Sequence, residues 1–196
     1  MAWFMAREGG RYDALVEGRK RDLLSTLSGT VVELGSGTGP NLRYIPSGVR
    51  LVAVEPNAFM HPHFLQRALG LGRHVTLIRA DAQALPFPDG SIEAVLSTLV
   101  LCSVRGLDEA LKEVHRVLKP GGIFIFMEHV GAPRGSWLRR AQRLVRPVWS
   151  AVGDGCEPDR DTSHNLERAG FSSIRMDRFD LPLPLVSPHI AGVAEK

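Results

Sequence analysis

Residues 31–39 read Val-Val-Glu-Leu-Gly-Ser-Gly-Thr-Gly, and this stretch decides the fold. Its apolar, β-branched start predicts a buried strand, and its glycines predict a loop whose backbone can approach a ligand closely. A dinucleotide-binding G-x-G-x-x-G fingerprint would need a glycine at position 40, where the chain has Pro40. The spacing G-x-G-x-G behind the acidic Glu33 is instead the form that binds S-adenosylmethionine.

A second acidic residue strengthens this interpretation. The apolar run Leu51–Val54 ends in Glu55. If the two runs are parallel strands, Glu55 lies near the glycine loop, where its carboxylate can accept hydrogen bonds from two ribose hydroxyls. A glycine loop alone is weak evidence, because tight turns need glycine anyway. The combination of loop and acid therefore carries the prediction.

Strand-like and helix-like segments alternate along the chain, which predicts an α/β fold with a mostly parallel sheet. Helices are expected over residues 12–27, from Gly39–Tyr44 onward, after a cap at Asn57, over 107–118, over 136–149 and over Leu166–Ala169. Parallel strands are expected at Thr30–Leu34, Arg50–Glu55, Val75–Arg79, Ile92–Leu96 and Ile123–Met127, and an antiparallel pair at Phe171–Phe179 and Ile190–Ala194.

Composition narrows the class of protein. The 196 residues are most simply one domain, and a net charge of +3 does not by itself argue for a nucleic-acid binder. No D-P-P-Y or N-P-P-Y signature of nucleic-acid methylation occurs. The two cysteines are too few for a disulfide framework, so a reducing, cytoplasmic compartment is expected. No apolar run is long enough to span a bilayer, and the sequence by itself assigns no oligomeric state.

Ligands of open parallel sheets bind at the carboxyl ends of the strands. An acid after the third expected strand can accept from the adenine amine, and residues after the fourth can border the methyl donor. The cofactor-binding residues predicted in this way are Glu33, Gly35, Ser36, Gly37, Gly39, Asn41, Glu55, Pro56, Asn57, Asp81, Ala82, Ser97, Thr98 and Leu99.

The order E-L-G-S-G-T-G, V-E-P-N, A-D-A and V-L-K-P-G-G resembles the class I S-adenosylmethionine-dependent methyltransferases. The segments T-L-V-L-C-S-V (98–104), F-M-E-H-V (126–130), D-G-C (154–156) and P-H-I (188–190) resemble, more narrowly, the methyltransferase-like seven family of alkyl thiol S-methyltransferases. The resemblance implies a Rossmann-like three-layer sandwich whose seven-stranded sheet ends in a reversed strand. It also implies a leading helical lid, here residues 1–28, over a catalytic core at 29–196.

The sequence departs from that family at two points. Animal members begin with a hydrophobic anchoring segment of a kind not seen in this sequence. Their ribose-binding acid is usually aspartate, where this chain has Glu55.

Methyl transfer mainly requires that the acceptor be held in line with the activated methyl group. The resemblance favours a small apolar thiol acceptor and the product S-adenosylhomocysteine. Because a thiolate is the better nucleophile, a base or positive neighbour helps. His129 is the first candidate, Asp154 can orient a base, and His189 is a third candidate. Each histidine can equally be a buried, hydrogen-bonded core residue.

No metal site is expected from the spacing of ligand residues. His61-Pro62-His63 has no accompanying ligand cluster, so a surface turn is expected there. Cys102 follows an apolar strand and is expected in the core, whereas Cys156, in a Gly-Asp-Gly-Cys turn, is expected to line the acceptor pocket.

Residues 136–149 form a basic amphipathic segment, in which Trp137 and Leu144 fall on one side and Arg140 and Arg143 on the other. Pro147 is expected to kink or end the helix. The favoured interpretation packs its apolar side on the sheet. Alternatives are peripheral contact with an anionic membrane or cover for an acceptor pocket.

Other functions remain open at this level. The glycine corner addresses only the cofactor, so N-, O- or C-methylation of a small molecule, a quinone or a phospholipid headgroup is compatible with it. A non-catalytic S-adenosylmethionine-binding module is the alternative from another class.

Overall fold

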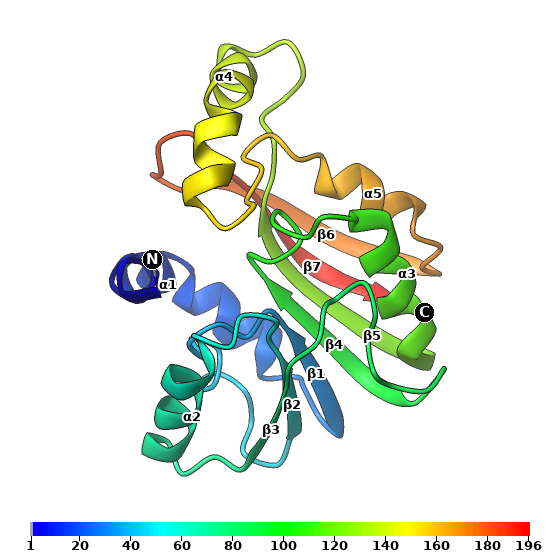
Figure 1. Ribbon diagram of the computed structural model, residues 1–196. Coiled ribbons are helices and arrows are strands. Elements are labelled where there is room, and N and C mark those ends of the chain that lie inside the picture. The colour runs from blue at the N-terminus through cyan, green and yellow to red at the C-terminus, as the bar shows by residue number, and fades with distance from the viewer. Residues whose placement is uncertain (1) are drawn as a thin grey trace.

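The computed structural model describes the backbone of residues 2–196 and the side chains from residue 11 onward. Helices and strands alternate through most of the chain (Figure 1). The helices are α1 (Ala2–Leu24), α2 (His61–Gly70), α3 (Leu107–Val117), α4 (Trp137–Val152) and α5 (Thr162–Arg168). The strands are β1 (Thr30–Leu34), β2 (Arg50–Val54), β3 (Val75–Ile78), β4 (Ile92–Thr98), β5 (Leu118–His129), β6 (Ser173–Asp180) and β7 (Pro188–Glu195).

The strands form one seven-stranded sheet in the order β3-β2-β1-β4-β5-β7-β6. The pairings among β1 to β5 are parallel, and β7 runs antiparallel to both of its neighbours. The predicted three-layer α/β sandwich with a reversed last strand is confirmed. The register places Leu34 opposite Val54 and Ser97, so the carboxyl ends of the central strands meet at one edge.

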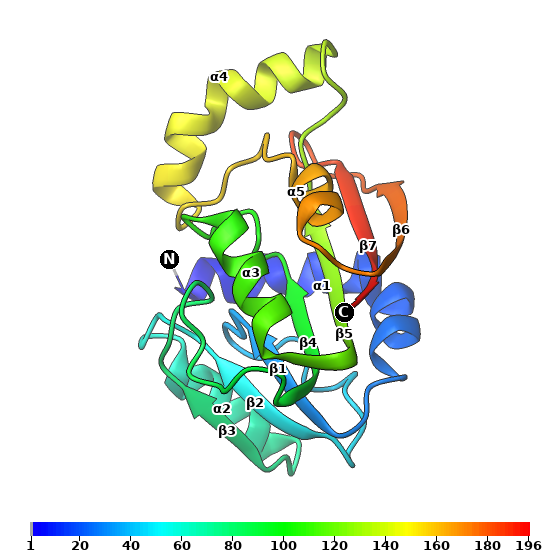
Figure 2. The ribbon, with the colours of Figure 1, turned by 90° about the vertical axis from the view of Figure 1, so that its right-hand side faces the viewer.

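Successive residues of a strand point to opposite faces of a sheet, and both faces of this one are buried. Val32 of β1 belongs to an apolar cluster with α3 and α5, and Val31 belongs to a second cluster with α2 and the end of α1. Figures 1 and 2 show α3 and α5 on one side of the sheet and α2 on the other. Helix α3 follows the predicted spacing, and the acidic residues of its first turn interact favourably with the positive end of the helix dipole.

Residues 39–44 do not begin a helix, so that prediction was wrong. They form consecutive turns, in which Gly39 O accepts from Leu42 N–H and Asn41 O from Tyr44 N–H. Pro46 follows too soon for a helix to grow, because helix nucleation is costly and needs length.

Two predictions at the start of α2 also fail. Asn57 does not cap the helix; its Oδ1 accepts from Phe59 N–H at 3.1 Å in a turn before α2. His61 and His63 stand in the first turn of α2 instead of a surface turn, with Pro62 at a position where a proline fits a helix.

Strand β5 extends through Glu128 and His129, which were expected just after it. Ser97 and Thr98 likewise end β4 instead of following it. These side chains are therefore held by strand pairing, and their positions are fixed more firmly than loop positions would be.

Helix α4 reverses the expected packing. Trp137, Leu144 and Val148 are 78%, 83% and 71% exposed, whereas Arg139 and Gln142 are buried. Gln142 explains the reversal: its Oε1 accepts from Ala132 N–H and its Nε2 donates to Leu185 O, so it satisfies buried backbone groups. The prediction that the apolar side packs on the sheet was wrong.

Pro147 does not end α4, which continues to Val152. Figure 2 shows the helix standing beyond the end of the sheet, with a bend in its axis. Within residues 2–196, no helix combines the length and the hydropathy needed to cross a bilayer.

Candidate active site

The glycine loop after β1 is built from backbone conformations that favour glycine. Gly35, Gly37 and Gly39 have φ angles of 53°, 54° and 77°. A side chain at Gly35 would also meet Val100 Cγ2 at 2.6 Å, whereas at Gly37 the nearest atom would be Gly35 O at 3.9 Å. The loop therefore packs tightly against the segment after β4 at Gly35 and leaves open space at Gly37.

Glu55 stands just past β2 and is held by two backbone donors. Its Oε2 accepts from Gly37 N–H and its Oε1 from Asn57 N–H, both at 2.8 Å. The side chain is only 6% exposed, so its orientation is fixed. Each carboxylate oxygen keeps a further lone pair that can accept a ribose hydroxyl. The geometry is compatible with the predicted ribose contact, which stays a prediction.

Asn41 links Glu33 on β1 to Thr98 at the end of β4. Asn41 Nδ2 donates to Glu33 Oε1 at 2.7 Å and to Thr98 Oγ1 at 3.0 Å. Three buried polar atoms nearby in sequence, Glu33 Oε2, Asn41 Oδ1 and Ser36 Oγ, have no partner among the described residues. Buried polar atoms are normally hydrogen-bonded. The two free acceptor oxygens could accept hydrogen bonds from the ammonium group of S-adenosylmethionine, and the free hydroxyl could donate one to its carboxylate.

Burial raises the pKa of the Glu33 carboxyl to about 7. Its hydrogen bond with Asn41 and the neighbouring Lys20 favour the charged form but do not outweigh the burial.

This shift predicts how the stability of the ligand-free protein depends on pH. The folded-state pKa lies above the unfolded value of 4.5, so the unfolded chain loses its proton first. The Glu33 contribution to stability should therefore fall as pH rises from 4.5 through about 7 and then level, by at most about 3 kcal/mol. His189, whose pKa burial lowers to about 4, adds a slope of opposite sign below pH 6.5, so the Glu33 contribution is measured as a difference between proteins. In urea unfolding, Glu33→Gln should lack the Glu33 slope that the wild type shows. Exposed Glu167→Gln should retain it, and an unchanged slope in Glu33→Gln would contradict the assignment.

The residues predicted to lie beside the adenine are more exposed to solvent than Glu33 and Glu55. Asp81 is exposed, and its Oδ1 accepts from Gln83 N–H at 2.9 Å, so Oδ2 remains open to a donor. Ala82 beside it is buried. Pro56 is exposed next to Glu55. Their part in binding the adenine stays a prediction.

Glu128 organises the segment after β4, a role that the sequence analysis missed. Its Oε1 accepts from the Ser97 hydroxyl at 2.7 Å and from Val100 N–H, and its Oε2 accepts from Leu101 N–H. The Ser97 hydroxyl is therefore engaged by Glu128. Leu99 adopts a φ of 56°, an unusual conformation for a residue with a side chain. Glu128 thus fixes a tight turn directly beside the glycine loop.

The three predicted catalytic residues receive different surroundings. His129 is buried, and its Nε2 lies 3.0 Å from Cys156 Sγ. His189 lies opposite His129 on β7, its Nδ1 bonded to Ser187 O, and burial lowers its pKa to about 4. Asp154 is exposed and has no side-chain hydrogen bond within the described part of the chain. His129 is the one candidate placed beside a sulfur atom.

Cys102 and Cys156 come together with His129. Cys102 is buried, as expected, and Cys156 is half-buried. Their sulfur atoms and a ring nitrogen of His129 all lie within 4.8 Å of one another. The pKa of the Cys156 thiol is raised, first by a hydrogen bond with Cys102 and then by burial.

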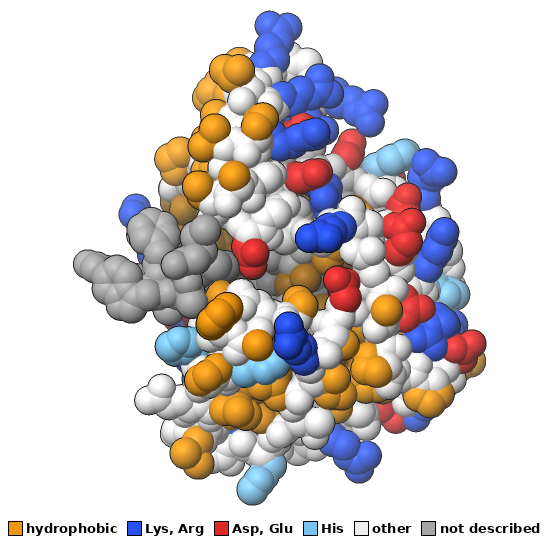
Figure 3. All heavy atoms as spheres, in the orientation of Figure 1, with side chains coloured by type: hydrophobic (Ala, Val, Ile, Leu, Met, Phe, Trp, Pro, Cys, Tyr) orange, Lys and Arg blue, Asp and Glu red, His pale blue; other side chains and the backbone are white. Residues whose placement is uncertain are grey.

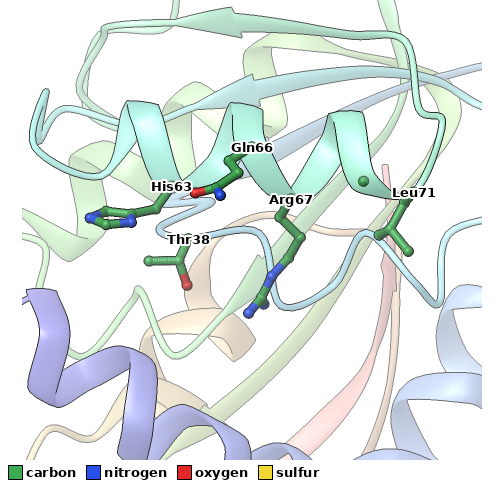
Figure 4. Close-up of a pocket in the computed structure, with 6 residues that line it drawn as sticks. Thr38, His63, Gln66, Arg67 and Leu71 are labelled. Atoms are coloured by element: carbon green, nitrogen blue, oxygen red, sulfur yellow. The ribbon is translucent and has the colours of Figure 1, made fainter.

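One open cavity, of about 420 Å³, lies between Thr38 of the glycine loop and the α2 side chains His63, Gln66 and Arg67 (Figure 4). The other, of about 460 Å³, lies around the ends of β5 and β7 and includes His189 and Arg139. The second lies beside two of the predicted catalytic residues, because His189 lines it and pairs with His129.

A family model described as a methyltransferase domain matches residues 32–126. An S-adenosylmethionine-dependent methyltransferase from Mesorhizobium loti has the same fold, with a TM-score of 0.68, 22% identity, and 93% of this chain and 98% of that chain covered. The fold and the matching domain are those of the class I methyltransferases, which use S-adenosylmethionine and release S-adenosylhomocysteine.

Sequence relatives narrow the family. The chain is 39% identical to thiol S-methyltransferase TMT1B of Homo sapiens, over 92% of this chain and 80% of the relative. It is 37% identical to human thiol S-methyltransferase TMT1A, over 99% of this chain and 85% of the relative. The chain belongs to this methyltransferase family, which confirms the resemblance found in the sequence.

Proposed function

We propose that the enzyme transfers the methyl group of S-adenosylmethionine to the sulfur of a small apolar thiol. The main support is where the similarity lies. The general methyltransferase model ends at residue 126, whereas the similarity to the two human thiol S-methyltransferases covers 92% and 99% of the chain. It therefore includes segments beyond the cofactor-binding half, which supports a shared acceptor class. Membership of a family of methyltransferases favours an enzyme over the non-catalytic binding module.

The chain's own residues have distinct tasks in this proposal. Glu55 and the glycine loop hold the cofactor, which supplies an activated methyl group when bound. Glu128 fixes the turn between the cofactor loop and the acceptor side. His129 favours the thiolate form of the acceptor, since it already faces a sulfur atom. The low pKa of His189 makes it a weak base, and the exposed Asp154 is better suited to shaping the loop that carries Cys156.

A comparison of isosteric acceptors tests this function. Mass spectrometry should detect methyl benzyl sulfide from benzyl mercaptan, and no methylated product from benzyl alcohol or benzylamine. Asp81→Ala should reduce the yield through weaker cofactor binding. His129→Ala should lower the rate about 10²-fold or more near neutral pH, with partial recovery at alkaline pH, where the thiol ionises unaided. His164→Ala, at an exposed position on α5, is the matched control. Methylation of the amine or alcohol instead would overturn the thiol assignment.

Helix α1 further supports the predicted division into a leading lid, residues 1–28, and a core, residues 29–196. The Tyr12 ring lies 5.6 Å from that of His189, and Val16 packs with Met127 of β5. Both contacts join α1 to the strands that end at the acceptor side. We propose that α1 covers this side of the site.

We also propose that α4 contacts an anionic membrane surface. Its exposed apolar side, Trp137, Leu144, Val148 and Val152, gathers in one area of Figure 3, with Lys and Arg side chains beside it. An apolar helix side flanked by arginines fits the boundary of an anionic lipid layer. Apolar thiols partition into such layers, so this contact would place the enzyme near its acceptor.

Vesicle sedimentation checks the membrane contact. Binding to phosphatidylserine-containing vesicles should weaken about tenfold or more in Leu144→Asp, because a buried leucine contributes about 1.5–3 kcal/mol. Leu69→Asp on α2, where the leucine is 81% exposed, is the matched control and should bind like the wild type. Added salt should also weaken binding. Equal binding of the two variants would exclude α4 as the contact.

A further inference from the structure

The cluster of Cys102, His129 and Cys156 was not expected, because the ligand residues are widely separated in sequence. The step from Cys102 to His129 and the step from His129 to Cys156 each span 27 residues, a spacing that matches no metal-binding motif. The fold brings them together at the carboxyl ends of β4 and β5, beside the cofactor loop.

We propose that Cys102, His129 and Cys156 bind one zinc ion whose fourth position is open to the acceptor thiol. This inference rests on the proposed thiol methylation and makes the role of His129 more specific: as a ligand of the ion, it favours the acceptor thiolate through the metal. Two thiolates and one imidazole are a known three-residue zinc set that keeps a position for substrate.

The distances suit such a site. The ligand atoms lie within 4.8 Å of one another, and His129 Nε2 is 3.0 Å from Cys156 Sγ. Tetrahedral zinc bonds of about 2.0–2.3 Å separate neighbouring ligand atoms by roughly 3.6–3.8 Å. The side chains need to shift by only about half an ångström to surround the ion.

The backbone that carries the ligands is held in place. Glu157 N–H donates to Cys102 O at 2.9 Å, which joins the two cysteine segments directly. Arg160 Nη1 donates to Leu101 O and Val104 O, on either side of Cys102. His129 is fixed by β5, where it pairs with His189. The site is therefore arranged before any ligand arrives, as tight metal sites require.

Both sulfur atoms also have neighbours that can donate to a metal-bound thiolate. Trp149 Nε1 donates to Cys156 Sγ at 3.3 Å, and the Ser103 hydroxyl lies 3.6 Å from Cys102 Sγ. Such outer contacts orient and stabilise metal ligands.

The position of the cluster explains why an open site would be useful. Val100, two residues before Cys102, touches the glycine loop at Gly35. A thiol bound to the ion would release its proton to solvent and remain a thiolate at neutral pH. Its sulfur would attack the methyl carbon; the new sulfur–carbon bond would form as the bond to the sulfonium sulfur breaks, whose electron pair would stay on that sulfur. The neutral thioether product would be a weaker ligand and would leave.

Metal content and cobalt spectroscopy test the proposal. Protein purified with a phosphine reductant and without chelator should contain one zinc ion per chain by plasma mass spectrometry. Cys102→Ser, Cys156→Ser and His129→Asn should each reduce that content, whereas exposed His63→Asn should not. In the apoprotein, Co²⁺ should give sulfur-to-cobalt charge-transfer absorption that is lost in the cysteine variants. Benzyl mercaptan should change this spectrum, and benzyl alcohol should not.

Each contrary result has a separate meaning. Binding of Co²⁺ by the wild type no tighter than by Cys102→Ser or Cys156→Ser would overturn the metal site. A cobalt spectrum unchanged by benzyl mercaptan would overturn the open position. Full thiol methylation after complete metal removal would overturn the activating role while leaving the proposed function standing. A metal-loaded protein that methylates no thiol would instead refute the proposed function.

Discussion

Replacing Glu55 by alanine is expected to weaken S-adenosylmethionine binding about a hundredfold without unfolding the protein. The variant loses a charged acceptor for two ribose hydroxyls, and hydrogen bonds to charged groups contribute about 1.5–3 kcal/mol each. It also frees Gly37 N–H and Asn57 N–H, which the carboxylate now holds at 2.8 Å. Isothermal titration calorimetry with S-adenosylmethionine and S-adenosylhomocysteine measures the effect.

Glu55→Asp provides the informative control. It keeps the charge and shortens the side chain by one methylene, so it should retain much more affinity than Glu55→Ala. Glu167→Ala, at an exposed position on α5, should bind like the wild type. An unchanged affinity in Glu55→Ala would mean that the carboxylate supports only the loop and does not reach the ribose.

Replacing Glu128 by alanine is expected to lower the free energy of unfolding by about 3–5 kcal/mol. The fully buried carboxyl accepts from the Ser97 hydroxyl, Val100 N–H and Leu101 N–H. Its removal leaves three buried donors without acceptors, and each such loss costs about 1–3 kcal/mol. Urea unfolding followed by circular dichroism measures the change.

Glu128→Gln separates the loss of hydrogen bonds from the loss of volume. Glutamine keeps the size and one acceptor oxygen, so the loss should be intermediate. The variant should also methylate more slowly, because the turn at Leu99 would be held less firmly. A loss below about 1 kcal/mol in Glu128→Ala, after comparison with Glu167→Ala, would show that water replaces the carboxylate at little cost.

Both large effects, on cofactor affinity and on the free energy of unfolding, are expected at buried carboxylates. In these predictions Glu55 acts through the cofactor, whereas Glu128 acts through the backbone of the turn after β4. Cofactor affinity and unfolding free energy are independent readouts, so the two roles can be separated experimentally.

The sequence by itself determined the sheet and the cofactor corner. Strand propensity, the apolar spacing of α3 and the glycines before Pro40 are local properties, and they predict local structure without knowledge of the rest of the chain. Glu55 was predictable because its place at the end of a strand follows from counting along the sequence. The pairing of β1 with β2 then brings it to the loop.

The tertiary structure decided everything that depends on residues far apart in sequence. The amphipathic pattern of α4 indicates a helix but does not specify which side is buried. Gln142 decides this through its bonds to Ala132 and Leu185. Residues 39–44 have a helix-like beginning, but Pro46 leaves the segment too short.

The acceptor side shows the same limit most clearly. Cys102, His129 and Cys156 are ordinary residues along the chain and become a cluster only because β4, β5 and the segment after α4 end together. A sequence pattern predicts periodicity and local spacing. The meeting of these three side chains depends instead on the order of the strands and on backbone contacts such as that between Glu157 and Cys102. Local chemistry therefore predicted the candidate cofactor residues, whereas only long-range packing brings the candidate acceptor-side residues together.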